Sequence, residues 1–120
     1  MGVLRGAAKD ADPAVREAAA RSMGWTEDVV WAPTLVQALG DADARVRSAA
    51  ARSLGWVGAV DAWSALLAAT ADVDADVRRR SVRALERLDV GRASQEPAIK
   101  AMVGDPDPKV ARAARQVTGH

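Results

Sequence analysis

Residues 41–56 read Asp41-Ala-Asp-Ala-Arg-Val-Arg-Ser-Ala-Ala-Ala-Arg-Ser-Leu-Gly-Trp56, and residues 10–25 read almost the same, Asp10-Ala-Asp-Pro-Ala-Val-Arg-Glu-Ala-Ala-Ala-Arg-Ser-Met-Gly-Trp25. Two weaker copies begin at Asp72 and Asp105. The first three copies are 31 residues apart, and the fourth follows after 33 because the connection 89–96 is longer. Self-similarity at a fixed period of roughly 20 to 50 residues is typical of stacked repeats. The sequence therefore predicts a tandem array.

Each copy is predicted to form two helices joined by the Asp-x-Asp turn. The first helix carries one apolar residue at a constant distance before the turn: Leu4, Leu35, Leu66 and Ile99. In the second helix, apolar residues recur every three or four positions, the spacing of a helix face. The second Asp of the turn is expected to accept a hydrogen bond from the free amides that begin this helix. We expect Gly24 and Gly55 to end it as C-terminal caps.

A single helix pair of this kind could not bury its apolar faces, whereas a stack of four can. We therefore expect an all-α fold, a right-handed α-solenoid that forms one domain over residues 1–120. The repeats are predicted at about 1–26, 27–57, 58–90 and 91–120. Because 49% of the chain is hydrophobic but Phe, Tyr and Cys are absent, small side chains must fill the core and the helices must pack closely.

The pattern Asp-x-Asp-x-x-Val-Arg-x-x-Ala, followed by Leu or Met and Gly, resembles the short HEAT-like repeats of about 30 residues seen in phycobilisome lyases. This resemblance covers nearly the whole chain. It implies that the second helices line a concave inner face and that the first helices lie on the convex side. It also implies a ladder of charged side chains between repeats, formed by Asp12, Asp43, Asp74, Arg16, Arg47 and Arg78.

The charge balance excludes binding that relies on a field around the whole molecule. Lys and Arg total 17 and Asp and Glu total 16, so the formal net charge is +1. No apolar run reaches the ~18 residues of a membrane span, and the first residues lack the features of a signal peptide. We expect a cytoplasmic protein that does not bind membranes.

The sequence also lacks the arrangements of residues that are typical of catalytic and metal sites. The one imidazole belongs to His120, and a base at a frayed chain end cannot be positioned beside a nucleophile. The paired carboxylates of the Asp-x-Asp turns recur in every copy, which indicates capping rather than a single active site. The glycines Gly55 and Gly58 do not have the spacing of a nucleotide-binding loop. We expect no catalytic residue, no metal and no cofactor.

Four tryptophans supply all the aromatic side chains. Trp25 and Trp56 occupy the same repeat position just after the second helix, where two neighbouring rings would anchor a protein partner. The alternative is that each ring folds back as a plug between repeats. Trp63 is predicted to lie in the core, and Trp31 is predicted to be partly exposed.

A second candidate binding feature is a row of side chains across the second helices. One repeat position changes along the chain from acidic to basic, through Glu17, Ser48, Arg79 and Arg112. Arg83 follows Arg79 on the same face of its helix. A graded inner groove would orient an extended acidic peptide or a phosphate backbone. The alternative is a solvated helix face whose arginines are balanced by neighbouring carboxylates.

These features favour a non-catalytic scaffold for protein–protein interaction, with the partner bound on the concave face or on the edge that carries the tryptophans. The alternative is nucleic-acid binding, because DNA-alkylation-repeat glycosylases are similar helical stacks with a basic concavity. The near-neutral charge offers few phosphate contacts for that function. An apolar, glycine-containing end at residues 1–8 is typical of an end-to-end homodimer, and equally of a piece of a longer array or of a designed or trimmed module.

Overall fold

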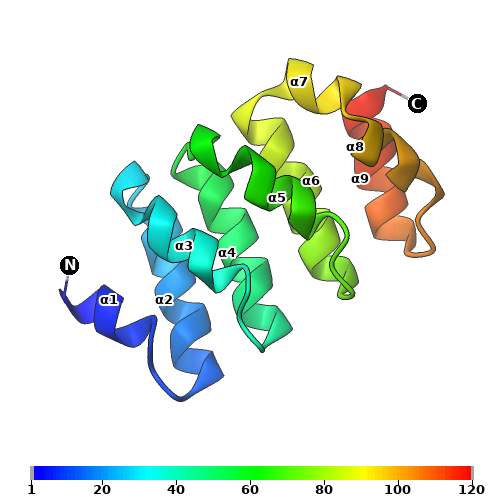
Figure 1. Ribbon diagram of the computed structural model, residues 1–120. Coiled ribbons are helices and arrows are strands. Elements are labelled where there is room, and N and C mark those ends of the chain that lie inside the picture. The colour runs from blue at the N-terminus through cyan, green and yellow to red at the C-terminus, as the bar shows by residue number, and fades with distance from the viewer. Residues whose placement is uncertain (1, 120) are drawn as a thin grey trace.

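The computed structural model describes residues 2–119 and places them in an elongated stack of helices (Figure 1). The stack measures 43 × 25 × 18 Å along its principal axes. Nine α-helices and three short 3-10 segments make up the regular structure of the described residues, which contain no strand. The main contacts join each unit to the next one along the chain. The predicted all-α solenoid is confirmed.

The longer helices lie side by side and form the second-helix layer: α2 (Pro13–Trp25), α4 (Ala44–Trp56), α6 (Ala75–Leu88) and α9 (Pro108–Thr118) (Figure 1). The shorter helices form the first-helix layer: α1 (Gly2–Ala7), α3 (Ala32–Ala38), α5 (Trp63–Ala69) and α8 (Pro97–Ala101). The 3-10 segments η1 (Val29–Trp31) and η2 (Val60–Ala62) lead into α3 and α5, and η3 (Met102–Gly104) follows α8.

The Asp-x-Asp turns start the second helices in the same way each time. The second carboxylate accepts a hydrogen bond from a backbone amide of the first turn, at 2.9 Å for Asp12 and 2.8 Å for Asp43 and Asp74. The first carboxylate accepts from the amide of the second Asp and tightens the turn; the Asp41 to Asp43 bond measures 2.9 Å. These bonds satisfy amides that a helix start leaves without a partner.

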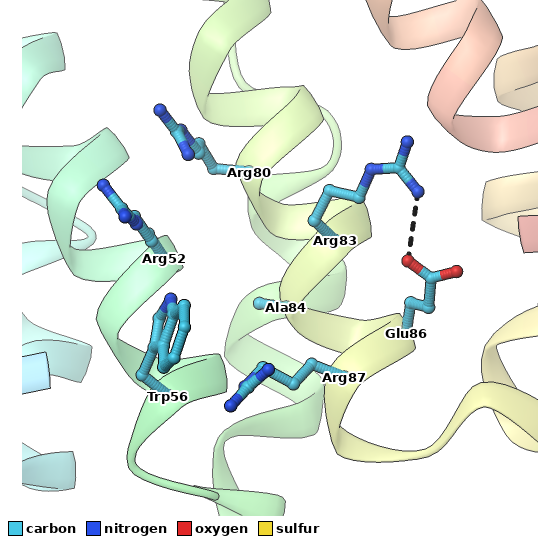
Figure 2. Close-up of a pocket in the computed structure, with 7 residues that line it drawn as sticks. All are labelled: Arg52, Trp56, Arg80, Arg83, Ala84, Glu86 and Arg87. Carbon is cyan, nitrogen blue, oxygen red and sulfur yellow. Dashed lines mark hydrogen bonds and ion pairs between the residues drawn. The ribbon is translucent and has the colours of Figure 1, made fainter. Parts of the chain in front are cut away.

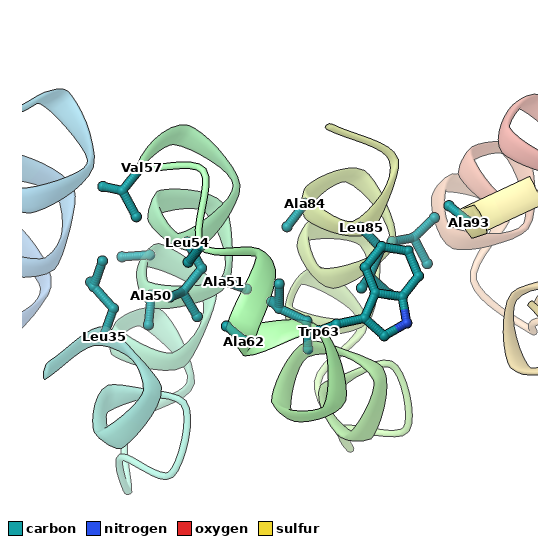
Figure 3. Packing of buried hydrophobic residues seen from close by; sticks show 14 of the residues in the cluster. Leu35, Ala50, Ala51, Leu54, Val57, Ala62, Trp63, Ala84, Leu85 and Ala93 are labelled. Atoms are coloured by element: carbon teal, nitrogen blue, oxygen red, sulfur yellow. The ribbon is translucent and has the colours of Figure 1, made fainter. Parts of the chain in front are cut away.

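The core lies between the two layers and runs the length of the stack (Figure 3). Its fully buried side chains come from corresponding positions of successive units, among them Leu35, Leu66 and Ile99 of the first helices. Trp63 is buried, as predicted, with its indole nitrogen unpaired and the Arg92 guanidinium 4.2 Å from the ring centroid. Trp31 was predicted to be partly exposed, and this is wrong. Because the Asp28 side chain caps η1, that turn directs the Trp31 ring into the core.

Gly24 and Gly55 do not end their helices, contrary to the prediction. Helices α2 and α4 continue to Trp25 and Trp56, and both glycines are buried within the last turn. A Cβ on Gly24 would lie 2.4 Å from the Ser53 hydroxyl oxygen, and one on Gly55 would lie 3.0 Å from the Cα of Ala84. These glycines are therefore required for the close approach of neighbouring second helices.

The long connection after the third unit is also more ordered than a loop. Residues Val90–Gln95 form a further helix, α7, which directly follows α6. Asp89 both ends α6 and caps α7, through a 3.0 Å hydrogen bond from the Arg92 amide. Ala93 of α7 is fully buried in the core. The two extra residues are therefore accommodated by a helix and not by a flexible segment.

The glycine contacts predict an asymmetric response to alanine substitution. Gly24→Ala should lower the thermal unfolding midpoint by several degrees, because the new methyl group overlaps Ser53 and overpacking costs about 1 to 3 kcal/mol. Gly6→Ala is the matched control, since a Cβ at this helical position meets nothing within 4 Å. Alanine should leave the midpoint there unchanged or raise it. Equal effects in thermal melts followed by circular dichroism would contradict the close-approach role.

Candidate interaction surface

Three ion pairs of one geometry connect consecutive second helices. The Arg16 guanidinium donates to both carboxylate oxygens of Asp41, at 2.9 and 3.1 Å. Arg47 makes the same two-bond contact with Asp72, at 3.0 and 3.1 Å, and Arg78 makes it with Asp105, at 3.0 Å for both bonds. Each arginine also donates to two backbone carbonyls of its own turn, which for Arg47 are those of Asp41 and Ala42.

The carboxylates in this ladder are not the ones that the family resemblance suggested. Asp12, Asp43 and Asp74 cap helices, and the first Asp of the following turn receives the arginine instead. The reason is geometric: the second Asp is turned toward the amides of its own helix, whereas the first faces the preceding unit. Asp43 binds the exposed Arg45 at 3.0 Å, and these contacts lower the pKa of Asp43 to about 2.

The ladder side chains are mostly shielded from solvent and electrostatically matched. The Arg47 and Asp72 side chains are 15% and 14% exposed. Hydrogen bonding to Arg16 and Arg78 holds the pKa values of Asp41 and Asp105 below their ordinary value. Partial burial raises the pKa of Asp72, but its bonds with Arg47 and with the Asp74 amide outweigh that effect and lower it overall. These arginines therefore serve the stack and leave no free charge for a partner.

The repeat position whose charge was predicted to change from acidic to basic along the stack is partly neutralised by pairing within the chain. Ser48 is buried at 8% exposure and donates its hydroxyl to Asp76 of the next helix, so its polar group is already engaged within the stack. Arg79 pairs with the same Asp76 at 2.8 Å. Glu17 is half-buried and Arg112 is exposed, at opposite ends of the row. Asp76 thus interrupts the predicted gradient in the middle.

A second row of arginines crosses the same solvent-facing side of the second helices. Arg21, Arg52 and Arg83 stand at one repeat position, 31 residues apart, and Gln116 follows in α9. Arg83 donates to Glu86 at 3.1 Å and also to Gln116. Arg21 and Arg52 have no carboxylate within ion-pair distance in the part of the chain that the structure describes. The 31-residue recurrence was visible in the sequence and could have revealed this row.

Arg52 and Arg83 of this row also line a depression between α4 and α6, which we call the α4–α6 pocket (Figure 2). It has a volume of about 310 Å³ and is lined by Arg52, Trp56, Arg80, Arg83, Ala84, Glu86 and Arg87. In Figure 2, Arg52 and Arg80 project from the two helices on one side, and Trp56 lies between Arg52 and Arg87. Arg83 turns away toward Glu86. The lining therefore carries four positive charges and one negative charge.

A neighbouring depression, lined by residues of α2, α4 and α6, continues this surface. It is smaller, about 150 Å³, and shares Arg52 and Arg80 with the α4–α6 pocket. Its other charged lining residues are Glu17, Arg21, Arg45 and Asp76. The charges that line this smaller depression are therefore mixed, whereas those that line the α4–α6 pocket are mostly positive.

The two predicted tryptophan anchors have different environments. Trp25 is 72% exposed and Trp56 is 40% exposed, so the alternative of buried plugs is wrong for both. The Arg87 guanidinium lies 4.0 Å from the centroid of the Trp56 ring. At this distance a cation interacts favourably with an aromatic face. Trp56 belongs to the α4–α6 pocket, whereas Trp25 stands outside both depressions.

Two further observations concern other kinds of site. His120 lies outside the described residues, and within residues 2–119 no group of three or more acidic side chains is arranged to hold a metal ion. No helix in that range is long and apolar enough to cross a membrane.

Comparison with protein families agrees with this architecture. The family of HEAT repeats matches residues 2–86, which is well over half of the chain. The chain belongs to the HEAT-repeat family. Members of this family are commonly scaffolds for protein interactions and are generally non-catalytic. The sequence matches no curated protein.

The ladder of this HEAT-repeat protein predicts that two arginines on one helix differ in their effect on stability. Arg47→Ala should lower the free energy of unfolding by about 2 kcal/mol, because it leaves the shielded Asp72 carboxylate without its partner. Arg45→Ala is the control, since that side chain is 59% exposed in its pair with Asp43 and exposed pairs contribute little. Chemical denaturation of both variants measures the difference. An unchanged Arg47→Ala protein would contradict the ladder's structural role.

The lowered pKa of Asp72 also predicts how the ladder responds to acid. The folded state favours the ionised carboxylate, so its contribution is present above the ordinary pKa of 3.8 and is lost as pH falls through the lower folded value. Asp72→Asn should therefore destabilise the HEAT-repeat stack at neutral pH. The stability difference from the unsubstituted chain should shrink steadily below about pH 4. A difference that is independent of pH in denaturation curves would show that the charge of Asp72 does not matter.

Proposed function

We propose that this chain is a non-catalytic interaction module that binds a partner protein across the solvent-facing side of its second helices. The main observation in support of this proposal is the pair of adjacent depressions between α2, α4 and α6, which share Arg52 and Arg80. Together they form a track of charged side chains that crosses two inter-helix junctions. An extended segment of a partner, laid across the helices, would contact both depressions at once.

Charge and aromatic content support a protein partner with acidic residues. Arginine and tryptophan are the side chains most enriched at energetically important positions of protein interfaces. Arg52, Trp56 and Arg87 stand together at the α4–α6 pocket, and Trp25 extends the aromatic edge by one unit. Because Arg52 has no carboxylate partner among residues 2–119, a carboxylate from another chain would pair with it without displacing an internal contact.

Nucleic acid is less well matched to the same surface. A duplex or single strand places a phosphate at every nucleotide, so it needs a continuous basic track. Here Glu17 and Asp76 line the depression next to the α4–α6 pocket, and they would repel the adjoining phosphates. The formal net charge of +1 also provides little long-range attraction.

The test is capture of partners from a lysate of the source cells, treated with nuclease, on the immobilised chain. Arg52→Gln/Arg80→Gln and Trp25→Ala/Trp56→Ala remove the proposed contacts. Lys100→Gln/Arg115→Gln is the control, because it removes the same charge from exposed positions outside both depressions. Thermal melts by circular dichroism verify that each variant is folded.

We expect a protein that is retained by the unsubstituted chain and the control, and whose binding drops about tenfold or more in the arginine variant. Purification of that protein and titration against each variant then gives the affinities. Equal retention by all variants would place the binding surface elsewhere. Recovery of nucleic acid alone from an untreated lysate, with loss in the arginine variant, would favour the nucleic-acid alternative instead.

A further inference from the structure

The α4–α6 pocket holds more positive charge than its own carboxylate can balance. Glu86 is the only acidic lining residue, and it is engaged with Arg83 at 3.1 Å. Arg52 and Arg87 have no carboxylate within ion-pair distance in the described part of the chain, and Arg87 rests on the Trp56 ring. These two guanidinium groups are therefore available to an anionic group from outside the chain.

Arg80 is held in an environment that disfavours its charge. Partial burial lowers its pKa, and the nearby charges of Arg79 and Arg52 lower it further. Asp76 lies 3.8 Å away and compensates only in part, because it already accepts hydrogen bonds from Ser48 and Arg79. An anion placed between Arg52 and Arg80 would remove this repulsion.

The placement of Arg52 and Arg80 suits a compact anionic group better than a flat surface. Arg52 and Arg80 come from facing helices and project to the same side of the pocket, and Trp56 lies between Arg52 and Arg87 (Figure 2). The 310 Å³ depression has room for a tetrahedral oxyanion together with the side chain that carries it. Guanidinium groups bind such oxyanions through paired, nearly parallel hydrogen bonds.

We propose that the α4–α6 pocket binds a phosphorylated side chain of the partner protein through Arg52 and Arg80. This inference rests on the proposed function, since it names the chemistry that the interaction module recognises. A phosphate monoester carries a charge of about −1.5 to −2 and three acceptor oxygens, which matches two guanidinium groups better than the single charge of a carboxylate does. One isolated phosphate also avoids the neighbouring Glu17, which a phosphate backbone would meet.

The direct test uses fluorescein-labelled degenerate peptide pools that differ only in the central residue: phosphoserine, phosphotyrosine, serine or glutamate. Binding to the full chain is measured by fluorescence anisotropy at fixed ionic strength. At least one phosphorylated pool should bind about tenfold more tightly than both the serine and the glutamate pools. Arg52→Gln/Arg80→Gln should abolish this preference, and Lys100→Gln/Arg115→Gln should keep it.

If the double variant does not fold, Arg52→Gln alone supplies the same comparison, because Arg52 makes no ion pair among the described residues. The preference should then fall severalfold. Equal binding of the glutamate and phosphorylated pools would overturn the proposal, as would a preference that survives removal of these arginines.

A second measurement separates this inference from the proposed function. The lysate is treated with phosphatase before capture, beside a sample in which the phosphatase is inhibited. Loss of the arginine-dependent partner after dephosphorylation would support recognition of a phosphorylated side chain. Retention of that partner would overturn the phosphate inference, although the proposed interaction surface would stand.

Discussion

Neighbouring second helices touch at points where almost no side chain intervenes. A Cβ on Gly55 would meet the backbone of Ala84, and Gly24 lies against Ser53, whose hydroxyl donates to the Ala20 carbonyl at 2.6 Å. This short separation sets the distance across which the other contacts between α2, α4 and α6 act. It lets the guanidinium of Arg47 reach Asp72 in the Asp-x-Asp turn of the next unit. It also allows a chain without Phe or Tyr to fill its core with alanine, valine and leucine.

The same residue type serves two purposes on these helices, and local surroundings decide between them. Arg47 satisfies its donors with a carboxylate and two carbonyl oxygens, so its charge is consumed within the stack. Arg52 lies only five residues further along α4 but faces solvent, beside Arg80 of the next helix and not beside an acid. A guanidinium is strongly attractive to other molecules only where its own chain leaves it unmatched, which is the condition of the α4–α6 pocket.

The repeat pattern was sufficient to predict the solenoid and the helix starts, because capping by Asp12 or Asp43 depends on a few adjacent residues. Features that depend on the next unit were harder to predict. The partner of Arg47 depends on which Asp of the next Asp-x-Asp turn faces the preceding unit. The burial of Trp31 depends on a 3-10 turn, and the role of Gly24 depends on the distance to the neighbouring helix. For the candidate surface, the sequence indicated Arg83, Trp56 and the inner face. It did not reveal that the Ser48 hydroxyl is hydrogen-bonded to Asp76 or that Arg52 and Arg80 line the same pocket.

The glycine contacts and the ion pairs hold α2, α4 and α6 together near both of their ends, so this part of the face has a regular spacing. Packed helices stand about 8 to 10 Å apart, and an extended peptide advances about 3.3 Å per residue. A segment lying across the stack therefore returns to an equivalent position about every third residue. Arg21, Arg52 and Arg83 occupy equivalent positions on three successive second helices. Such a surface selects its ligand by the interval between charged groups as well as by their chemistry.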